Sequence, residues 1–434
     1  MRIDTIMVRN FKKFDAGTCA LHPQFTLLVG ENGSGKTSIL DALAVALGIW
    51  LVEPPDSTLV ASGRNIMPAE IRLEPTRTGD RILFRERRPV IVSATGQIGD
   101  RSGVTWLRQI RERGRRTTNA DAKDARAAIK DLFRRDTAGE NVLCPVIAYY
   151  GAGRAWLPSN QRTPGAKPNG PARRWAAFYD CLNERIRLSD LQKWFRSELI
   201  AAAHAGQMRP GFHIVRRAII ASVPDADDIW FDPDREQIVL SIKGQSQPFD
   251  NLSAGQRMML ALVADIAIKA VTQNTFLVPE SGHDATDGEL LRVLRLTPGV
   301  ILIDELDVHL HPRWQRRVAS DLKRTFPALQ FVCTSHSPQV IGEIEPDEIR
   351  LLDSFEVPNQ SFGMDSNWIL QALMGADEQD ANVKTQLKEV FQLISDKQLE
   401  AAENSVQDLR ARIGNSQAIQ RAASTIERVR LLGR

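Results

Sequence analysis

A glycine-rich segment, GENGSGKT at residues 30–37, carries the clearest chemistry in this 434-residue chain. It follows the apolar run at 25–29 and precedes apolar residues at helical spacing, so we expect a strand before it and a helix after it. Free backbone amides at such a helix start bind phosphate, and Lys36 would reach the terminal phosphates of ATP. The residues expected to bind ATP here are Gly30, Asn32, Gly33, Ser34, Gly35, Lys36, Thr37 and Ser38.

Two adjacent carboxylates end a second apolar segment, VILIDELD at residues 300–307. A buried strand would hold Asp304 beside the phosphate loop, where Asp304 and the Thr37 hydroxyl would bind Mg²⁺. Glu305, one residue further, would polarise the water that attacks the γ-phosphate. We therefore predict Glu305 and Lys36 as catalytic residues, and Thr37 and Asp304 as metal ligands.

A third segment, LSAGQR at residues 252–257, begins a helix that should run to about residue 271, with Ser253 as its N-cap. A capped helix N-terminus is suited to binding an anion. The segment resembles the LSGGQ signature of ABC ATPases with one small residue changed. The resemblance places Ser253, Gly255 and Gln256 against the γ-phosphate of a nucleotide held by a second copy of the chain.

The segment FVCTSHSP, residues 331–338, resembles the switch region of the same ATPases. It implies that His336 contacts the γ-phosphate as a third catalytic residue, and that Asp307 belongs to the D-loop, which passes between subunits. His309 and His311 have the spacing of two zinc ligands. No third ligand cluster accompanies them, so packing within the D-loop is the preferred interpretation.

The glutamine that ABC ATPases carry before the signature, the Q-loop, is missing from its expected turn in VIAYYGAGRAW, residues 146–156. Either Tyr150 and Arg154 occupy that region or the glutamine lies elsewhere, as Gln109 would.

The elements needed to position these residues follow an α/β pattern. Strands are expected within residues 1–29, 60–110, 144–150 and 237–242, and helices over 36–47, 120–133 and 175–205. Strands at 300–303 and 329–333 flank a helix, as in a parallel sheet. After residue 380, two apolar helix faces appear: Leu387, Val390, Phe391 and Ile394, then Leu399, Ala402, Val406 and Leu409.

This pattern predicts an α/β fold of the ABC-type P-loop ATPase head, with a mixed sheet, flanking helices, an antiparallel N-terminal β subdomain, a helical insertion and a helical C-terminal tail. The expected domains are an N-terminal lobe with the phosphate loop at 1–160 and a helical insertion at 161–245. A C-terminal lobe with the signature and the carboxylate pair follows at 246–360, and a helical accessory tail at 361–434. No sustained heptad is present, so no long coiled coil is expected.

Composition is that of an ordinary folded protein: 43% of the residues are hydrophobic and 25% are charged. The four cysteines form no CxxC pair, which indicates reduced thiols. Neither a signal peptide nor a long apolar span is visible. We therefore expect a cytoplasmic protein without a membrane segment.

Positive charge is concentrated between residues 81 and 116, although the net charge is only +3. Ten arginines there could neutralise the phosphates of DNA or RNA, or else form a solvated face or a surface for an acidic protein. They are Arg81, Arg85, Arg87, Arg88, Arg101, Arg108, Arg111, Arg113, Arg115 and Arg116.

Together these motifs resemble the soluble ABC-type ATPases related to RecF, SMC and OLD proteins. The wider pattern of ENGSGKTSILDALAVALG, YYGAGRAW, NLSAGQRMMLALVADIA, LIDELDVHLHPRWQRRV, FVCTSHSPQV and MDSNWILQALMG resembles the PtuA ATPases of the Septu anti-phage system and their retron-associated relatives. The opening VRNFKKF implies that the segment from Asn10 to Lys13 lies near the nucleotide, with Asn10 and Lys12 as nucleotide contacts. The resemblance also implies an oligomer, at least a head-to-tail dimer, that works with a separate HNH nuclease.

The sequence therefore favours an ATP-hydrolysing sensor in anti-phage defence. The alternatives are a RecF-like DNA repair ATPase, an ABC transporter subunit, and a nucleotide-gated scaffold with little turnover. The long insertion and the missing glutamine disfavour the transporter, and Glu305 disfavours the scaffold.

Overall fold

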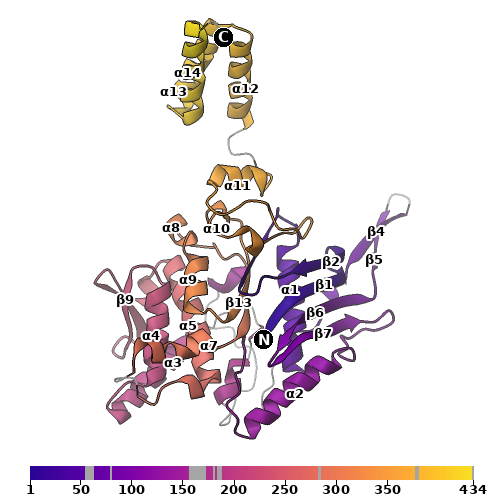
Figure 1. Cartoon of the computed structure of the whole chain (residues 1–434), viewed down its shortest axis with the longest axis vertical. Helices are drawn as coiled ribbons and strands as arrows, with labels where there is room; N and C mark the ends of the chain where they lie inside the picture. The colour runs from indigo at the N-terminus through magenta and orange to yellow at the C-terminus, as the bar shows by residue number, and fades with distance from the viewer. Residues whose placement is uncertain are drawn as a thin grey trace. The chain divides into compact units, whose positions relative to one another are not determined.

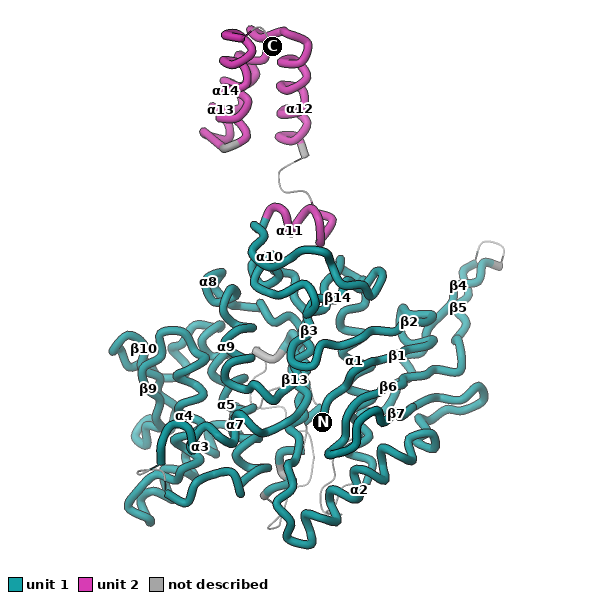
Figure 2. The backbone as a smooth tube through the Cα atoms, in the orientation of Figure 1, with its two compact units in different colours: residues 1–366 teal, residues 367–434 magenta. Residues whose placement is uncertain are grey.

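The computed structural model describes residues 1–53, 63–78, 81–155, 173–178, 181–182, 188–281, 285–376 and 381–432. The chain divides into two compact units, residues 1–366 and residues 367–434, which are coloured separately in Figure 2. Within the described residues, no helix has the length and apolar character needed to cross a bilayer.

A five-stranded parallel sheet forms the centre of the first unit, in the order β14-β3-β13-β12-β8. Its strands are short and almost wholly buried because helices cover both faces. Their carboxyl ends meet at one edge of the sheet. The strands are β3 (Phe25–Val29), β8 (Val146–Tyr150), β12 (Gly299–Ile303), β13 (Leu329–Thr334) and β14 (Ile349–Leu351).

A four-stranded antiparallel sheet, in the order β2-β1-β6-β7, lies beyond helix α1 (Lys36–Leu47). Ile6 of β1, Leu43 of α1 and Leu302 of β12 share one core, so α1 is packed between the two sheets. Helix α2 (Lys123–Thr137) packs against β7, and the hairpin of β4 and β5 projects from this side of the unit (Figure 1). The strands are β1 (Arg2–Phe11), β2 (Phe14–Ala20), β4 (Leu73–Thr78), β5 (Arg81–Glu86), β6 (Val90–Ile98) and β7 (Arg101–Ile110).

Helix α5 (Ala254–Gln273) packs against β8 and against α4, on the other side of the parallel sheet (Figure 1). The described part of the segment predicted as a helical insertion also contains the strands β9 and β10, which form an antiparallel sheet with β11, a strand that begins at the last residue of that segment. The elements are α3 (Leu188–Ala205), α4 (Pro210–Ser222), β9 (Ala226–Asp232), β10 (Gln237–Ile242) and β11 (Gln245–Pro248). The helices after α5 are α6 (Asp287–Leu290), α7 (Arg292–Leu296), α8 (Pro312–Gln315), α9 (Val318–Thr325) and α10 (Pro338–Ile341).

The second unit has its own apolar core, built by α12 (Ala381–Ser395), α13 (Leu399–Ile413) and α14 (Gln417–Leu432) after the short α11 (Ser366–Ala372). Leu387, Val390 and Ile394 are buried there as the helical spacing predicts. Phe391 is not: its side chain is 40% exposed. Phe391 therefore lies outside the apolar core of this unit, although the helical spacing puts it near the three buried residues.

The arginines between residues 81 and 116 do not form one stripe. Arg108 is fully buried, where its guanidinium donates to the carbonyls of Val45 and Arg64 and to the side chains of Asn65 and Asn119. Burial, with the charge of Arg64, lowers its pKa to about 10. A cation there stabilises the carboxyl end of α1, and its burial excludes Arg108 from any exposed surface, whether for a nucleic acid or for an acidic protein.

The exposed arginines fall into separate groups. Arg101 begins β7 and Arg111 follows the end of the same strand, so about 30 Å of extended chain separates them. Arg111, Arg113, Arg115 and Arg116 are exposed together in the loop after β7, whereas Arg87 pairs with Glu74 and Arg88 with Glu86.

Candidate nucleotide site

The phosphate loop joins β3 to α1, and its glycines allow a backbone that other residues would strain. Gly35, at the N-cap of α1, has φ of 98°. A Cβ atom at Gly35 would lie 2.6 Å from the ring of Phe14, so both conformation and space require glycine. The result is a helix start whose free amides face the carboxyl edge of the sheet, a suitable cradle for phosphate.

Lys36 is the cation of this loop. Its Nζ donates to the carbonyl oxygens of Gly30 at 2.8 Å and Glu31 at 2.9 Å, so the side chain folds back over the loop. Burial lowers the pKa of Lys36, and the nearby carboxylates Asp304 and Glu305 act in the opposite direction. Ser34, also in the loop, buries its hydroxyl without a hydrogen-bond partner in the described part of the chain. This hydroxyl is therefore able to form a hydrogen bond with a polar ligand bound in the loop.

The carboxylate pair lies beside the loop, as predicted. Thr37 Oγ1 donates to Asp304 Oδ2 at 3.0 Å, which joins the end of β12 to the start of α1. Thr334, at the end of β13, donates its hydroxyl to Asp304 Oδ1 at 2.6 Å and accepts from the Glu305 backbone N–H at 2.7 Å. Asp304 is therefore held from both sides.

Glu305 has a backbone φ of 49°, in the left-handed region that non-glycine residues seldom adopt. Such a conformation costs about 1–3 kcal/mol and is typical of functional positions. It turns the chain sharply at the end of β12, one residue after the carboxylate that contacts Thr37.

The switch segment after β13 is bound to the segment after Glu305. Asp307 Oδ1 accepts from Ser335 Oγ at 2.6 Å and from the His336 backbone N–H at 3.3 Å. Gln315 donates to the Asp307 and Leu310 carbonyls and accepts from Ser337 Oγ. Burial lowers the pKa of His336, and Lys36 lowers it further, so the imidazole is neutral at pH 7 and able to donate one hydrogen bond.

The LSAGQR segment begins α5 as expected. Ser253 Oγ accepts from the Gln256 backbone N–H at 3.3 Å, and Gln256 Oε1 accepts from the Ser253 N–H at 2.8 Å, which forms a capping box. Gly255 packs on the D-loop, where a Cβ atom would lie 2.5 Å from the His309 carbonyl oxygen. Among the described residues, no hydrogen bond or ion pair joins residues 252–257 to residues 30–38.

Tyr150, at the end of β8, connects the carboxylate edge with α5. Its hydroxyl donates to Asp265 Oδ2 at 2.6 Å, and its carbonyl accepts from the Asp304 N–H at 2.8 Å. Lys269 pairs with the same Asp265 carboxylate. Burial raises the pKa of Tyr150 well above its usual value, so it remains a donor. Tyr150 therefore joins the carboxylate edge to α5 in the region where a Q-loop glutamine was expected. The side chain of Arg154, the other residue expected there, lies outside the described residues.

Two predicted nucleotide contacts do not reach the phosphate loop. Asn10 is buried and donates to the Pro89 carbonyl, and Lys12 pairs with Asp41 of α1 and lies near Glu70. Lys13, at the end of the same segment, does reach the loop: its Nζ donates to the Gly33 carbonyl at 2.9 Å. The resemblance placed the Asn10 to Lys13 segment near the nucleotide, but the motif named Lys12 rather than Lys13 as the contact.

Oxygen atoms from Thr37 and Asp304 are the ligands that Mg²⁺ prefers, and the two side chains are already in contact. Among the described residues, no group of three or more His, Cys, Asp and Glu could hold a metal ion. His311 accepts from the Arg313 N–H as a helix cap, and the His309 backbone contacts Gly255. These contacts favour packing within the D-loop as the role of the two histidines, rather than zinc binding.

Thr334 was missed by sequence reasoning and provides a sharp test. Thr334→Val keeps the shape but removes one hydrogen-bond partner each from Asp304 and the Glu305 N–H, which costs about 1–3 kcal/mol. We expect the free energy of unfolding in urea to fall by that amount and kcat for ATP hydrolysis to fall about tenfold. Thr334→Ser retains the hydroxyl and should behave as wild type. Equal activity and stability of the valine and serine variants would contradict the role of Thr334.

The fold and the loop define a P-loop ATPase. Residues 5–195 match a family described as AAA domain, and residues 196–342 match the family AAA domain, putative AbiEii toxin, Type IV TA system.

The chain belongs to the family of the retron ATPases. It is 30% identical to the Retron Ec83 probable ATPase of Escherichia coli, over 86% of this chain and 76% of that protein. It is 27% identical to the Septu protein PtuA of Bacillus mycoides, but over 49% of this chain and only 26% of PtuA. The SMC head bound to the C-winged helix domain of ScpA gives a TM-score of 0.45 at 14% identity, covering 80% of this chain and 96% of that one.

Proposed function

We propose that this ATPase is a regulatory subunit of an anti-phage defence complex, in which ATP joins two copies head to tail and thereby controls a partner HNH nuclease. The defence role is supported by the retron and Septu relatives. The nuclease is supported only by the resemblance to the Septu ATPases.

The observation that carries the head-to-tail arrangement is the position of Ser253. Its helix start is capped and exposed, and it rests on the D-loop of its own chain rather than on its own phosphate loop. An anion-binding helix start and a phosphate loop that do not meet within one chain can both contact one nucleotide if a second copy supplies the other half.

Within such a composite site, each residue has a task set by its contacts. The loop amides and Lys36 hold the phosphates, with Lys13 at their edge. Mg²⁺ held by Thr37 and Asp304 would neutralise charge on the phosphates. Glu305 orients and deprotonates the attacking water, and neutral His336 donates to the γ-phosphate. Ser253 and the Gly255 amide contact the γ-phosphate from the second copy.

Hydrolysis would be sensed through two connections. Asp307 ties the switch segment to the D-loop, and Tyr150 ties the carboxylate edge to α5. Loss of the γ-phosphate removes contacts from both Lys36 and Ser253, so it would weaken the association of the two copies.

Light scattering of the purified chain tests this proposal. With Glu305→Gln to slow turnover, we expect the molar mass to rise in ATP but not in ADP. The second arm searches the neighbouring genes for an HNH protein and adds that protein to the chain, with co-elution and changed nuclease activity in ATP as the expected result. Equal masses in ATP and ADP would refute ATP-driven association, and separate elution would refute the nuclease partner.

Binding of a DNA or RNA backbone is a second candidate function. It is supported by the exposed arginines Arg111, Arg113, Arg115 and Arg116. Arg108 is excluded from it by burial.

A further inference from the structure

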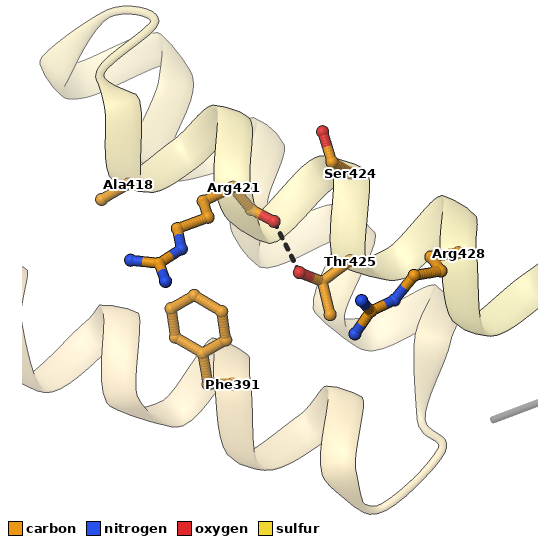
Figure 3. A pocket seen from close by; sticks show the side chains of 6 residues that line it. All are labelled: Phe391, Ala418, Arg421, Ser424, Thr425 and Arg428. Carbon is orange, nitrogen blue, oxygen red and sulfur yellow. Dashed lines mark hydrogen bonds between the residues drawn. The ribbon is translucent and has the colours of Figure 1, made fainter.

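A groove lies between α12 and α14 in the unit formed by residues 367–434. It encloses about 650 Å³ and is lined by Phe391, Ala418, Arg421, Ser424, Thr425 and Arg428. Figure 3 shows the Phe391 ring directed from α12 towards α14, with the guanidinium of Arg421 beside it; Ser424 points away from the ring. None of these residues belongs to the ATPase site.

The groove is positively charged and its charges are not neutralised. Arg421 and Arg428 lie on one face of α14, about 10 Å apart along the axis. Both are exposed, and neither pairs with a carboxylate of the described chain. By contrast, Arg430 of the same helix pairs with Glu403.

The acidic side chains nearest in sequence do not oppose this charge. Glu389 and Glu427 fall at least about 100° around their helices from Phe391 and Arg428. Two cations spaced along one helix, facing an aromatic ring, therefore form an uncompensated site for a partner with repeated negative charge.

Phe391 decides which polyanion fits. Its ring is 40% exposed although its neighbours Val390 and Ile394 are buried. An aromatic ring beside guanidinium groups is the arrangement that stacks an unpaired base while arginines contact the adjacent phosphates. The geometry points to a binding site for single-stranded nucleic acid in this groove, with Phe391 stacking a base and Arg421 and Arg428 contacting phosphates.

A duplex fits the groove less well because its paired bases already stack on each other. An acidic peptide fits less well because it would use the arginines without needing the ring. The site does not depend on the ATPase reaction, so its test reads binding in the absence of ATP.

Fluorescence anisotropy of the full chain with a labelled oligothymidylate of about 20 nucleotides tests the site. Phe391→Ala should weaken binding about 5- to 100-fold without changing the dependence on salt. Arg421→Glu with Arg428→Glu should weaken binding and reduce the slope of log K against log salt by about 1.4, at ~0.7 per phosphate. The matched control is Arg410→Glu with Arg412→Glu on α13, which changes the net charge by the same amount outside the groove. It should change neither the affinity nor the dependence on salt.

Three results would overturn the proposal. One is unchanged oligothymidylate binding in both groove variants. Another is equal weakening by the α13 control pair, which would indicate a general charge effect. The third is full competition by polyglutamate together with insensitivity to Phe391→Ala, which would assign the groove to an acidic protein. A duplex of the same length should bind more weakly to wild type and be insensitive to Phe391→Ala.

Discussion

Replacing Glu305 by glutamine should lower kcat for ATP hydrolysis by about 10²–10⁴-fold while leaving ATP binding intact. Glutamine has the size of glutamate but cannot accept the proton from the attacking water. The substitution leaves the backbone at this position unchanged: its N–H donates to the Thr334 hydroxyl, and its conformation is left-handed.

The measurement is single-turnover hydrolysis beside equilibrium binding of a fluorescent ATP analogue. Glu400→Gln, an exposed carboxylate on α13, is the control and should have no effect. Hydrolysis by Glu305→Gln within threefold of wild type would assign the general base to another residue.

Replacing Ser253 by arginine should abolish hydrolysis with little effect on ATP binding to the same chain. Ser253 is exposed in one chain, so a large side chain is tolerated there. The substitution removes the capping hydroxyl, which costs about 1 kcal/mol of helix stability, and it fills the space that a second copy's nucleotide would occupy. Loss of a preorganised donor typically costs 10²–10³-fold in kcat.

Ser253→Thr keeps a capping hydroxyl and should retain most of the activity. Circular dichroism separates a folding defect from a site defect, because only the former would change helix content. If Ser253→Arg hydrolyses ATP at the wild-type rate, α5 takes no part in the reaction.

The sequence predicted those parts of the site in which local pattern and chemistry coincide. The phosphate loop, the end of β12 and the capped start of α5 each combine a glycine-rich or apolar segment with a polar residue at a fixed offset. The structure brings Thr37 and Asp304 into contact and caps α5 with Ser253, at the positions the motifs indicated.

What the sequence could not show depends on packing between distant elements. Thr334 looks like any strand residue until β13 is placed between β3 and β12, where its hydroxyl reaches both carboxylate positions. Arg108 looks like a surface arginine until the end of α1 is placed over it. Lys12 and Lys13 are adjacent, and only the turn after β1 decides which of them faces the phosphate loop.

A mixing experiment tests most directly the claim that one catalytic centre is built from two copies. Lys36→Ala destroys one half of the site and Ser253→Arg destroys the other, so each variant alone should be inactive. In a mixed assembly, Lys36 from the Ser253→Arg chain and Ser253 from the Lys36→Ala chain form an intact site. With equal amounts and random pairing, we predict recovery of up to about a quarter of the wild-type ATPase activity. No recovery in a mixture whose mixed assemblies are demonstrated by differently tagged chains would contradict the composite site.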